Sequence, residues 1–387
     1  MKQLIVHCTP ELVQAALLED NRLVEMDSQY PIDKQKAGSM YAGRIVNVLP
    51  GMQAAFVDIG LEKNAFLYID DLLPVHVDKQ PKIKPPITEL VAAGQMVMVQ
   101  VSKEAERTKG ARVTTHYSIP GRWIVYMPGA DYIAISRKIE DDSERQRLKQ
   151  IMEGFLLPGE GVIARTGAAG QTEEVIWQDL QDLREQWQLI ESKWNTSEAP
   201  ATLYCDLDLL PRLVRDVITG GIEEIWIDAP SIYEEMRSLL HKRNPGWNGR
   251  ISFYDRRVPI FEQFGISEEL SRSIKRKIWL PSGGYLIIDH TEALTVIDVN
   301  TGKYTGSIDL EQTVFEINCE AAKEIPRILR LRNVRGIIIV DFIDMNVEQN
   351  RSTVLDIVTQ TVRKDRSRTI VVGWTKLGLL EMTRKRK

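Results

Sequence analysis

Residues 283–300, GGYLIIDHTEALTVIDVN, contain two runs rich in Val, Ile and Leu on either side of a polar segment, and this pattern predicts a β-hairpin. The second run ends in two polar residues, Asp298 and Asn300. Side chains two positions apart on a strand share a face, so the carboxylate and the amide are expected to lie together. A strand this rich in apolar residues would not be expected to end in a charge unless the charge has a role.

A second apolar run, GIIIV at 336–340, is followed directly by Asp341. It predicts a buried strand, and ligands commonly bind where such strands end in α/β sheets. If the two strand ends lie side by side, Asp298 and Asp341 converge with Asn300 beside them. Such a set suits Mg²⁺, which keeps several waters and accepts phosphate oxygens as further ligands. Asp344 is expected on the opposite face if the strand continues. The alternative interpretation of any single aspartate here is a helix cap or a strand end.

Length and composition indicate a soluble globular protein of two to four domains. The chain has 387 residues, too many for one hydrophobic core, and 43% of them are hydrophobic and 27% charged. No apolar run approaches the ~20 residues of a membrane-spanning helix, and the N-terminus lacks the pattern of a secretory signal, so we expect a cytoplasmic protein without a membrane segment. The spacing of cysteines and histidines indicates neither a disulfide framework nor a local zinc site.

Positive charge is concentrated in the C-terminal third. The formal net charge is −4, but residues 272–387 contain 20 Lys and Arg against 14 Asp and Glu, a balance of +6 that leaves −10 for residues 1–271. The cations cluster in RSIKRK (272–277), RILRLRNVR (327–335), VRKDRSR (362–368) and the terminal RKRK. Such clusters suit a polyanion such as nucleic acid. The alternative, which the clusters alone would favour, is a set of solvated helix faces.

Changes of pattern along the chain predict several subdomains. The first 36 residues are expected to form a strand, a short helix or turn at 9–20, and another strand. From residue 39 to about 117, short alternating strands broken by glycines predict a small barrel with a Pro-rich loop. Strands and two helices follow up to about 210, and then an α/β pattern. Beyond the hairpin we expect a helix from about 308, the strand that ends at Asp341, a helix near 347–364 and a last strand, RTIVVGW.

Several long motifs resemble one enzyme family. LPSGGYLIIDHTEALTVIDVNTG, NCEAAKEIPRILRLRNVRGIIIVDFIDMN and LGLLEMTRKRK resemble the catalytic domain of the RNase E/G endoribonucleases, nearer to the RNase G branch. Upstream, YAGRIVNVLPGMQAAFVDIGLEKNAFL resembles the RNA-binding OB-type domain of that family, and VIARTGAAG resembles its sensor of RNA 5′ ends. The resemblance is collinear over nearly all of the chain.

The resemblance implies an activity and a set of catalytic residues. The activity is a Mg²⁺-dependent cut in single-stranded RNA, in mRNA or rRNA precursors, that leaves a 5′ phosphate and a 3′ hydroxyl. Asp298 and Asp341 match the metal ligands of the family, with Mn²⁺ as the alternative ion. Asn300 matches the amide that assists at the scissile phosphate.

The resemblance also implies a pocket that gives preference to 5′-monophosphorylated RNA. Arg165 and Thr166 match the pair that grips the 5′-terminal phosphate, and Val125 and Arg368 match further positions of this pocket. The chemistry agrees, because an arginine forms planar, charge-assisted hydrogen bonds with phosphate and a threonine hydroxyl adds one more.

In the barrel, the resemblance implies a surface that binds single-stranded RNA. Phe56 and Phe66 match aromatic residues on which a base stacks, and Lys103 and Lys109 match basic RNA contacts. Stacking combined with cationic contacts is how OB folds hold single strands without strict sequence recognition. The alternative for Phe56 is a place in the barrel core. Near the catalytic residues, the glycines at 302 and 306 are expected to let RNA backbone approach closely.

The fold implied by the resemblance is an α+β multidomain chain. It consists of an RNase H-like subdomain (1–36 plus 211–275), an inserted OB-type domain (37–117), a 5′-sensor region (118–210) and a DNase I-like catalytic subdomain (276–387). The C-P-x-C zinc link and the small oligomerisation domain of larger family members are not found in this chain, so no zinc site is expected and the expectation of a homodimer is weakened. Two alternatives stay open: an RNA-binding factor without cleavage, which would have no use for the carboxylate pair, and a DNA-directed nuclease.

Overall fold

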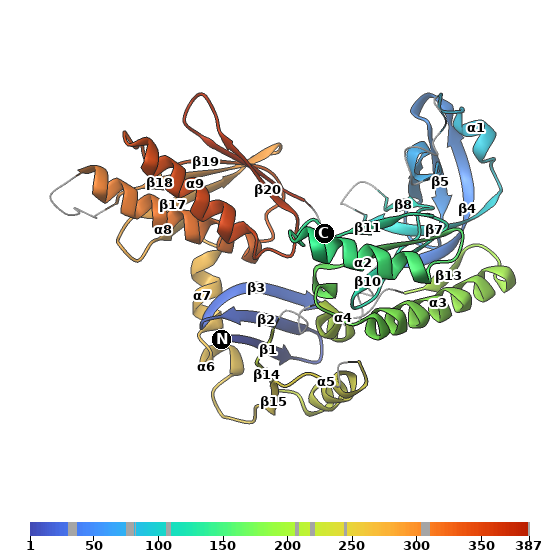
Figure 1. Ribbon diagram of the computed structural model, residues 1–387, viewed down its shortest axis with the longest axis horizontal. Coiled ribbons are helices and arrows are strands. Elements are labelled where there is room, and N and C mark those ends of the chain that lie inside the picture. Colours follow the sequence, from blue (N-terminus) through green and yellow to red (C-terminus); the bar gives the residue numbers. More distant parts are fainter. Residues whose placement is uncertain are drawn as a thin grey trace. The chain divides into compact units, whose positions relative to one another are not determined.

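The protein forms two compact units with a mixed α and β architecture (Figure 1). The computed structural model describes residues 1–29, 37–74, 81, 83–105, 110–205, 209–216, 221–243, 246–302 and 310–385. Unit 1 comprises Met1–Ser28, Ile222–Glu235 and Asn248–Lys387, and unit 2 comprises Gln29–Gly221 and Met236–Trp247. The described strands form four sheets, with helices between them. The expected α+β multidomain class is therefore confirmed.

In unit 1, the N-terminal strands pair with a segment from much later in the chain. β1 (Lys2–Cys8) runs antiparallel to β2 (Val13–Glu19) and parallel to β14 (Glu224–Ile227). With β3 (Arg22–Gln29) and β15 (Arg250–Phe253), the strand order is β15-β14-β1-β2-β3. Helices α6 (Ile260–Gln263) and α7 (Ile266–Ser273) follow β15 in unit 1, whereas α5 (Pro230–Arg243) is divided between the two units.

The expected short helix or turn at residues 9–20 is wrong, because most of this segment is the strand β2. Its sequence, VQAALLE, has good helix formers, but residues 15–18 are all buried. The strand lies between β1 and β3. Packing of this kind overrides a weak local preference for helix.

The other sheet of unit 1 contains the predicted hairpin. β17 (Tyr285–His290) and β18 (Leu294–Asn300) are antiparallel, as predicted. Helix α8 (Leu310–Leu331) precedes β19 (Gly336–Asp341), which runs parallel to β18. β16 (Lys277–Trp279), β20 (Thr369–Trp374) and β21 (Leu380–Arg384) complete the order β16-β17-β18-β19-β21-β20, and α9 (Glu348–Val362) lies between β19 and β20 in sequence.

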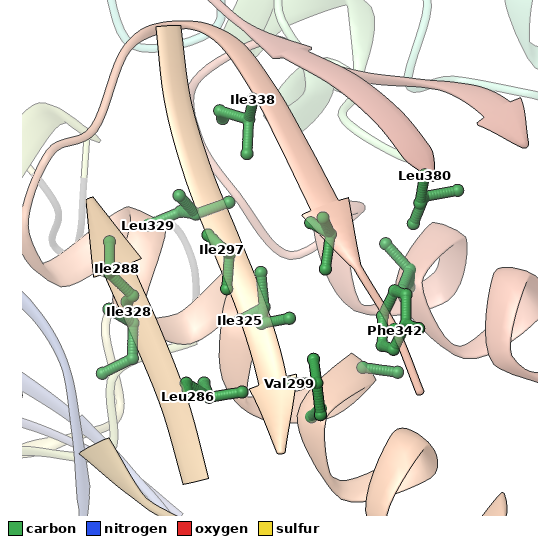
Figure 2. Close-up of a cluster of buried hydrophobic side chains, with 14 of the residues drawn as sticks. Leu286, Ile288, Ile297, Val299, Ile325, Ile328, Leu329, Ile338, Phe342 and Leu380 are labelled. Atoms are coloured by element: carbon green, nitrogen blue, oxygen red, sulfur yellow. The ribbon is translucent and has the colours of Figure 1, made fainter. Parts of the chain in front are cut away.

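One face of this sheet packs on helices α8 and α9. Figure 2 shows the resulting core, in which Ile297 and Val299 of β18 and Ile338 of β19 meet Ile325 and Leu329 of α8. The apolar residues of α8 recur every three or four positions, so they form one stripe along the helix. Because strand side chains alternate between faces, this packing leaves the alternate residues of β18 and β19 on the other face of the sheet.

Unit 2 contains a five-stranded barrel that is compatible with an OB fold. β4 (Met40–Leu49) pairs with both β5 (Ala54–Asp58) and β7 (Met96–Lys103), which closes the ring β4-β5-β6-β8-β7 through β6 (Ala65–Tyr68) and β8 (Arg112–Thr114). Ala55, Val57 and Leu67 are among the side chains that fill its interior. Strand β13 (Ala201–Tyr204) adds to β4, and the short helices η1 (Pro50–Met52), η2 (Ile69–Asp71) and α1 (Ile87–Leu90) lie in its connections.

The remaining sheet of unit 2 has the order β11-β12-β10-β9. Its strands are β9 (Ile119–Pro120), β10 (Ile124–Pro128), β11 (Ile133–Ile135) and β12 (Glu160–Ala164). Helices α2 (Asp142–Phe155), η4 (Thr166–Ala168), α3 (Glu173–Thr196) and α4 (Leu209–Asp216) accompany it. One face of α3 is apolar, and its residues Ile176, Leu180 and Leu183 are buried in the core, with Trp187 partly buried beside them.

Candidate active site

The two strand-end aspartates lie side by side. In the parallel pairing of β18 and β19, Asp298 is the direct partner of Asp341. Both side chains are exposed, because their neighbours Ile297, Val299 and Val340 take up the core face. The expected convergence of the two carboxylates therefore occurs, and it results from strand register and alternation.

Asn300 belongs to the same cluster. It lies two residues after Asp298 and donates a hydrogen bond from Nδ2 to Oδ2 of Asp298, at 2.7 Å. A primary amide has two N–H donors and a carbonyl acceptor. The second N–H and the carbonyl are therefore chemically suited to a water or a phosphate oxygen.

The electrostatics of this face favour a bound cation. Burial raises the pKa of Asp341, and the nearby charges of Asp298 and Asp344 raise it further. Asp344 was expected on the opposite face only if the strand continued to it. Strand β19 ends at Asp341, so that condition does not hold. Like charges held together in this way are relieved by a divalent cation, and carboxylate oxygens are the ligands that Mg²⁺ prefers.

In the described ranges, no group of three or more His, Cys, Asp or Glu side chains is placed to hold a metal ion. Two carboxylates fit an ion that keeps most of its water ligands, which is the usual behaviour of Mg²⁺. The carboxylates of Asp298 and Asp341 are thus chemically suited to serve as two of the ligands of a hard divalent cation.

The structure shows an intramolecular requirement for glycine at position 302, whereas the expected approach of RNA backbone stays a prediction. Its φ is +61°, and a Cβ placed on it would lie 2.3 Å from the carbonyl oxygen of Gly283 and 3.1 Å from Cδ1 of Tyr285. The tight turn after Asn300 thus requires glycine for intramolecular reasons. The other glycine of that expectation, at 306, lies outside the described residues.

In unit 2, Val125 lies on β10, and Arg165 and Thr166, also expected to bind the 5′ phosphate, come directly after the paired strand β12. Val125 is the partner of Ile163 across β10 and β12, and Arg165 lies two residues beyond Ile163. The Thr166 hydroxyl is 2.9 Å from the hydroxyl of Ser136. Arg368 is exposed but belongs to unit 1. Its place in the pocket, like the roles of the other three residues, stays a prediction.

Arg165 is held by groups that sequence reasoning missed. Its Nη2 donates to Oδ1 of Asp216 at 2.6 Å, and its Nη1 donates to the carbonyl of Gly121 at 2.6 Å. Burial alone would raise the pKa of Asp216, but hydrogen bonds and charge from Arg215 and Arg165 lower it to about 2. The guanidinium is therefore oriented by a permanent anion. Nothing in the sequence linked Arg165 to an aspartate 51 positions away.

On the barrel, Phe56 and Phe66 are cross-strand partners with their ring centroids 5.9 Å apart. Both are half-buried, whereas Ala55 and Val57 point into the barrel, so the alternative that Phe56 is a core residue is wrong. Lys103 is exposed at the end of β7. Lys109 lies outside the described residues.

Arg112 is a cation on this surface that the sequence did not reveal. Strand pairing aligns Lys103 with Arg112, Arg112 with Phe66, and Phe66 with Phe56. Arg112 also forms an ion pair with Asp71, at 2.7 Å. Two cations and two rings thus lie in one row across β7, β8, β6 and β5.

The two interpretations of the basic clusters in the C-terminal third, a polyanion-binding surface or solvated helix faces, are both wrong for two of their arginines. Arg330 of α8 is buried and pairs with Glu19 and Glu25, at 3.3 and 3.0 Å. Arg384 is buried and pairs with Asp365, at 2.6 Å. These arginines are neither solvated nor available to RNA, because they join segments within unit 1.

Known proteins resemble this chain along its whole length. The profile of the Ribonuclease E/G family matches residues 118–387. Ribonuclease G of Escherichia coli (strain K12) is 41% identical over 99% of this chain and 80% of that protein, and ribonuclease G of Haemophilus influenzae is 40% identical over 99% and 79%. Ribonuclease E of Nostoc sp. is 41% identical over 90% of this chain and 51% of that protein.

The matching solved structures are too distant to support an argument about the fold. The alpha subunit of aIF2 from Pyrococcus abyssi, for example, is 10% identical with a TM-score of 0.18, over 92% of this chain and 99% of that one.

Within the described part of the chain, no helix combines the length and the apolar composition needed to cross a bilayer.

Proposed function

The chain belongs to the ribonuclease E/G family, and from this premise we propose that it is a Mg²⁺-dependent endoribonuclease that cuts single-stranded RNA. We propose that its active site contains Asp298 and Asp341. The products are a 5′ phosphate and a 3′ hydroxyl, and the role is RNA processing and decay. The observation that carries the proposal is the direct pairing of the two aspartates at the ends of parallel strands.

The three polar residues Asp298, Asn300 and Asp341 have different roles in the proposed reaction. Asp298 and Asp341 would hold the ion. When bound, Mg²⁺ would polarise a phosphoryl oxygen and lower the pKa of a bound water. Asn300 is tied to Asp298 through one N–H. Its remaining N–H orients the scissile phosphate or the attacking water without adding negative charge to a site that already has two carboxylates.

We propose the 5′-phosphate pocket at Arg165 and Thr166 as the origin of a preference for 5′-monophosphorylated RNA, with Val125 as a further member; the role of Arg368, which belongs to unit 1, stays a prediction. The fixed guanidinium of Arg165 supports this role, because a pre-oriented arginine loses less entropy when it binds phosphate. Arg165→Ala should bring the ratio of the cleavage rates of 5′-monophosphorylated and 5′-hydroxyl RNA closer to one. An unchanged ratio would remove Arg165 from the pocket.

We also propose that the sheet containing β1 is RNase H-like and that the sheet containing β18 is DNase I-like, which the mixed pairing of each sheet supports. The row of Phe56, Phe66, Lys103 and Arg112 is proposed as the barrel's contact with single-stranded RNA. The cytoplasmic location and the homodimer stay predictions.

The central experiment uses end-labelled single-stranded RNA and DNA of one sequence, each incubated with the purified protein with and without Mg²⁺. We expect cleavage of RNA only, and only with the ion. Asp298→Asn and Asp341→Asn should abolish cleavage and leave RNA affinity largely intact. Asp289→Asn is the matched control, since Asp289 lies on the neighbouring strand β17 and is neutralised by Arg276 at 2.6 and 2.7 Å. Cleavage at the wild-type rate by both site variants would refute the assignment.

A further inference from the structure

An aromatic pair lies on the same sheet face as the candidate catalytic residues. Strand pairing aligns Trp279 of β16 with Tyr285 of β17, and Tyr285 with Asn300 of β18. Two residues further along the strands, and so on the same face, the pairing aligns Lys277 with Ile287, and Ile287 with Asp298. Neighbouring strands are about 4.8 Å apart, so the rings begin one strand away from the carboxylates.

Neither ring belongs to the hydrophobic core. The core side chains of β16 and β17 are Ile278, Leu286 and Ile288, which alternate with the aromatic residues and point to the helices. Trp279 is 54% exposed. Its ring meets that of Tyr285 edge to face, with centroids 5.3 Å apart. The two rings together therefore present an aromatic surface that is open to a ligand.

The aromatic pair also holds a cation. The Lys277 ammonium lies 4.1 Å from the centroid of the Trp279 ring and 3.6 Å from that of Tyr285. Cation–π attraction restricts this exposed ammonium while its N–H groups stay suited to a phosphate. A flat apolar surface beside a fixed cation matches the two parts of a nucleotide.

The tight turn after Asn300 braces this arrangement. A Cβ on Gly302 would lie 3.1 Å from the Tyr285 ring and 3.3 Å from Cζ3 of Trp279. The turn therefore packs against the edges of both rings. The candidate catalytic amide and the aromatic pair are thus parts of one continuous surface.

We propose that Trp279 and Tyr285 form a subsite that stacks an unpaired base of single-stranded RNA next to the scissile phosphate, with Lys277 binding an adjacent phosphate. The inference rests on the proposed function, because it takes Asp298 and Asn300 as the point of cleavage. RNA is the occupant that this face fits, since the ring surface continues directly into a site built for phosphate. Bases in a duplex are already stacked, so the subsite selects single strands at the cutting site itself.

The test is a binding cycle that does not depend on cleavage. Dissociation constants are measured without divalent cation for a short single-stranded RNA, and for a series in which each nucleotide in turn lacks its base. Trp279→Ala should weaken binding of the intact RNA about 5- to 100-fold, the range expected for one stacked base. For the RNA without the stacked base, the same substitution should change binding less than twofold. Trp279→Phe should retain most of the affinity.

Trp177→Ala is the matched control, because Trp177 is also exposed (39%) but lies on α3 of unit 2. It should not change binding of any RNA in the series. An equal loss with every RNA of the series, no loss at all, or a change of oligomeric state in sedimentation with Trp279→Ala would overturn the subsite. Failure of wild-type protein to cut RNA with Mg²⁺ would instead refute the proposed function, so the two failures are distinguishable.

Discussion

Replacing one candidate metal ligand should stabilise the protein when no divalent cation is present. In the paired strands, Asp298 and Asp341 place two negative charges on one face, and the charge of Asp298 contributes to the raised pKa of Asp341. Asp341→Asn removes this repulsion and preserves the shape of the side chain. It is the cleaner of the two substitutions, because Asp298 also accepts the hydrogen bond from Asn300.

The expected gain is about 1 kcal/mol. Unit charges about 5 Å apart repel by ~0.8 kcal/mol in bulk water and by ~3 kcal/mol at an effective dielectric constant of ~20. Both side chains are exposed, so the value lies near the lower figure. For a domain of about 150–250 residues, this corresponds to a rise of ~2–4 °C in melting temperature.

With magnesium bound, the wild-type protein should be more stable than Asp341→Asn, the reverse of the order expected without the ion. At a concentration ten times its Kd, an ion that binds the folded state adds about 1.4 kcal/mol to the wild-type protein. Asp341→Asn should lose this gain. The assay is thermal unfolding of both proteins in EDTA and in a Mg²⁺ titration, with Asp289→Asn as the control that keeps the wild-type response. A variant less stable than wild type in EDTA, or one stabilised equally by Mg²⁺, would refute the reasoning.

Three further outcomes can be checked. Asp216→Ala should narrow the preference for 5′-monophosphorylated RNA, because Arg165 loses the anion that orients it; if KM and kcat for such RNA match wild type, Asp216 has no positioning role. Asp365→Asn should cost about 3 kcal/mol in chemical denaturation, because it leaves the buried Arg384 without its carboxylate. Burial opposes ionisation of Asp365, but hydrogen bonds and charge from Arg384 lower its pKa overall. The difference in free energy of unfolding between wild type and Asp365→Asn should therefore be full at neutral pH and vanish as the pH falls through this lowered pKa. A difference in unfolding free energy that does not depend on pH would contradict the account. Lys103→Ala should reduce the slope of log Kd against log salt for single-stranded RNA by about 0.7, and an unchanged slope would exclude a phosphate contact.

The sequence predicted the elements of the candidate site better than their arrangement. Strand alternation is a local property, so Asp298 and Asn300 could be assigned to one face, and the apolar run before Asp341 marked a buried strand. The direct pairing of Asp298 with Asp341 could not be predicted, because register depends on how residues far apart in sequence pack on α8 and α9. The contact between Arg165 and Asp216 was missed for the same reason.

The errors came from reading local composition without burial. Residues 13–19 have the composition of a helix but form a strand, because their neighbours in the sheet bury them. The basic clusters near the C-terminus suited either a polyanion or solvated helix faces, but Arg330 and Arg384 are buried and paired with carboxylates. Charge can be counted from a sequence, but the partner that neutralises it comes from elsewhere in the chain.

The parallel pairing of β18 and β19 also makes catalytic competence depend on completed folding. The two strands are separated in sequence by α8, so the carboxylates meet only after that helix has packed on the sheet. A slip of one residue would turn Asp341 toward the core and Val340 toward solvent, and the core and the carboxylate pair would be lost together. Until this sheet has assembled, the chain has two separate aspartates and the candidate site does not exist.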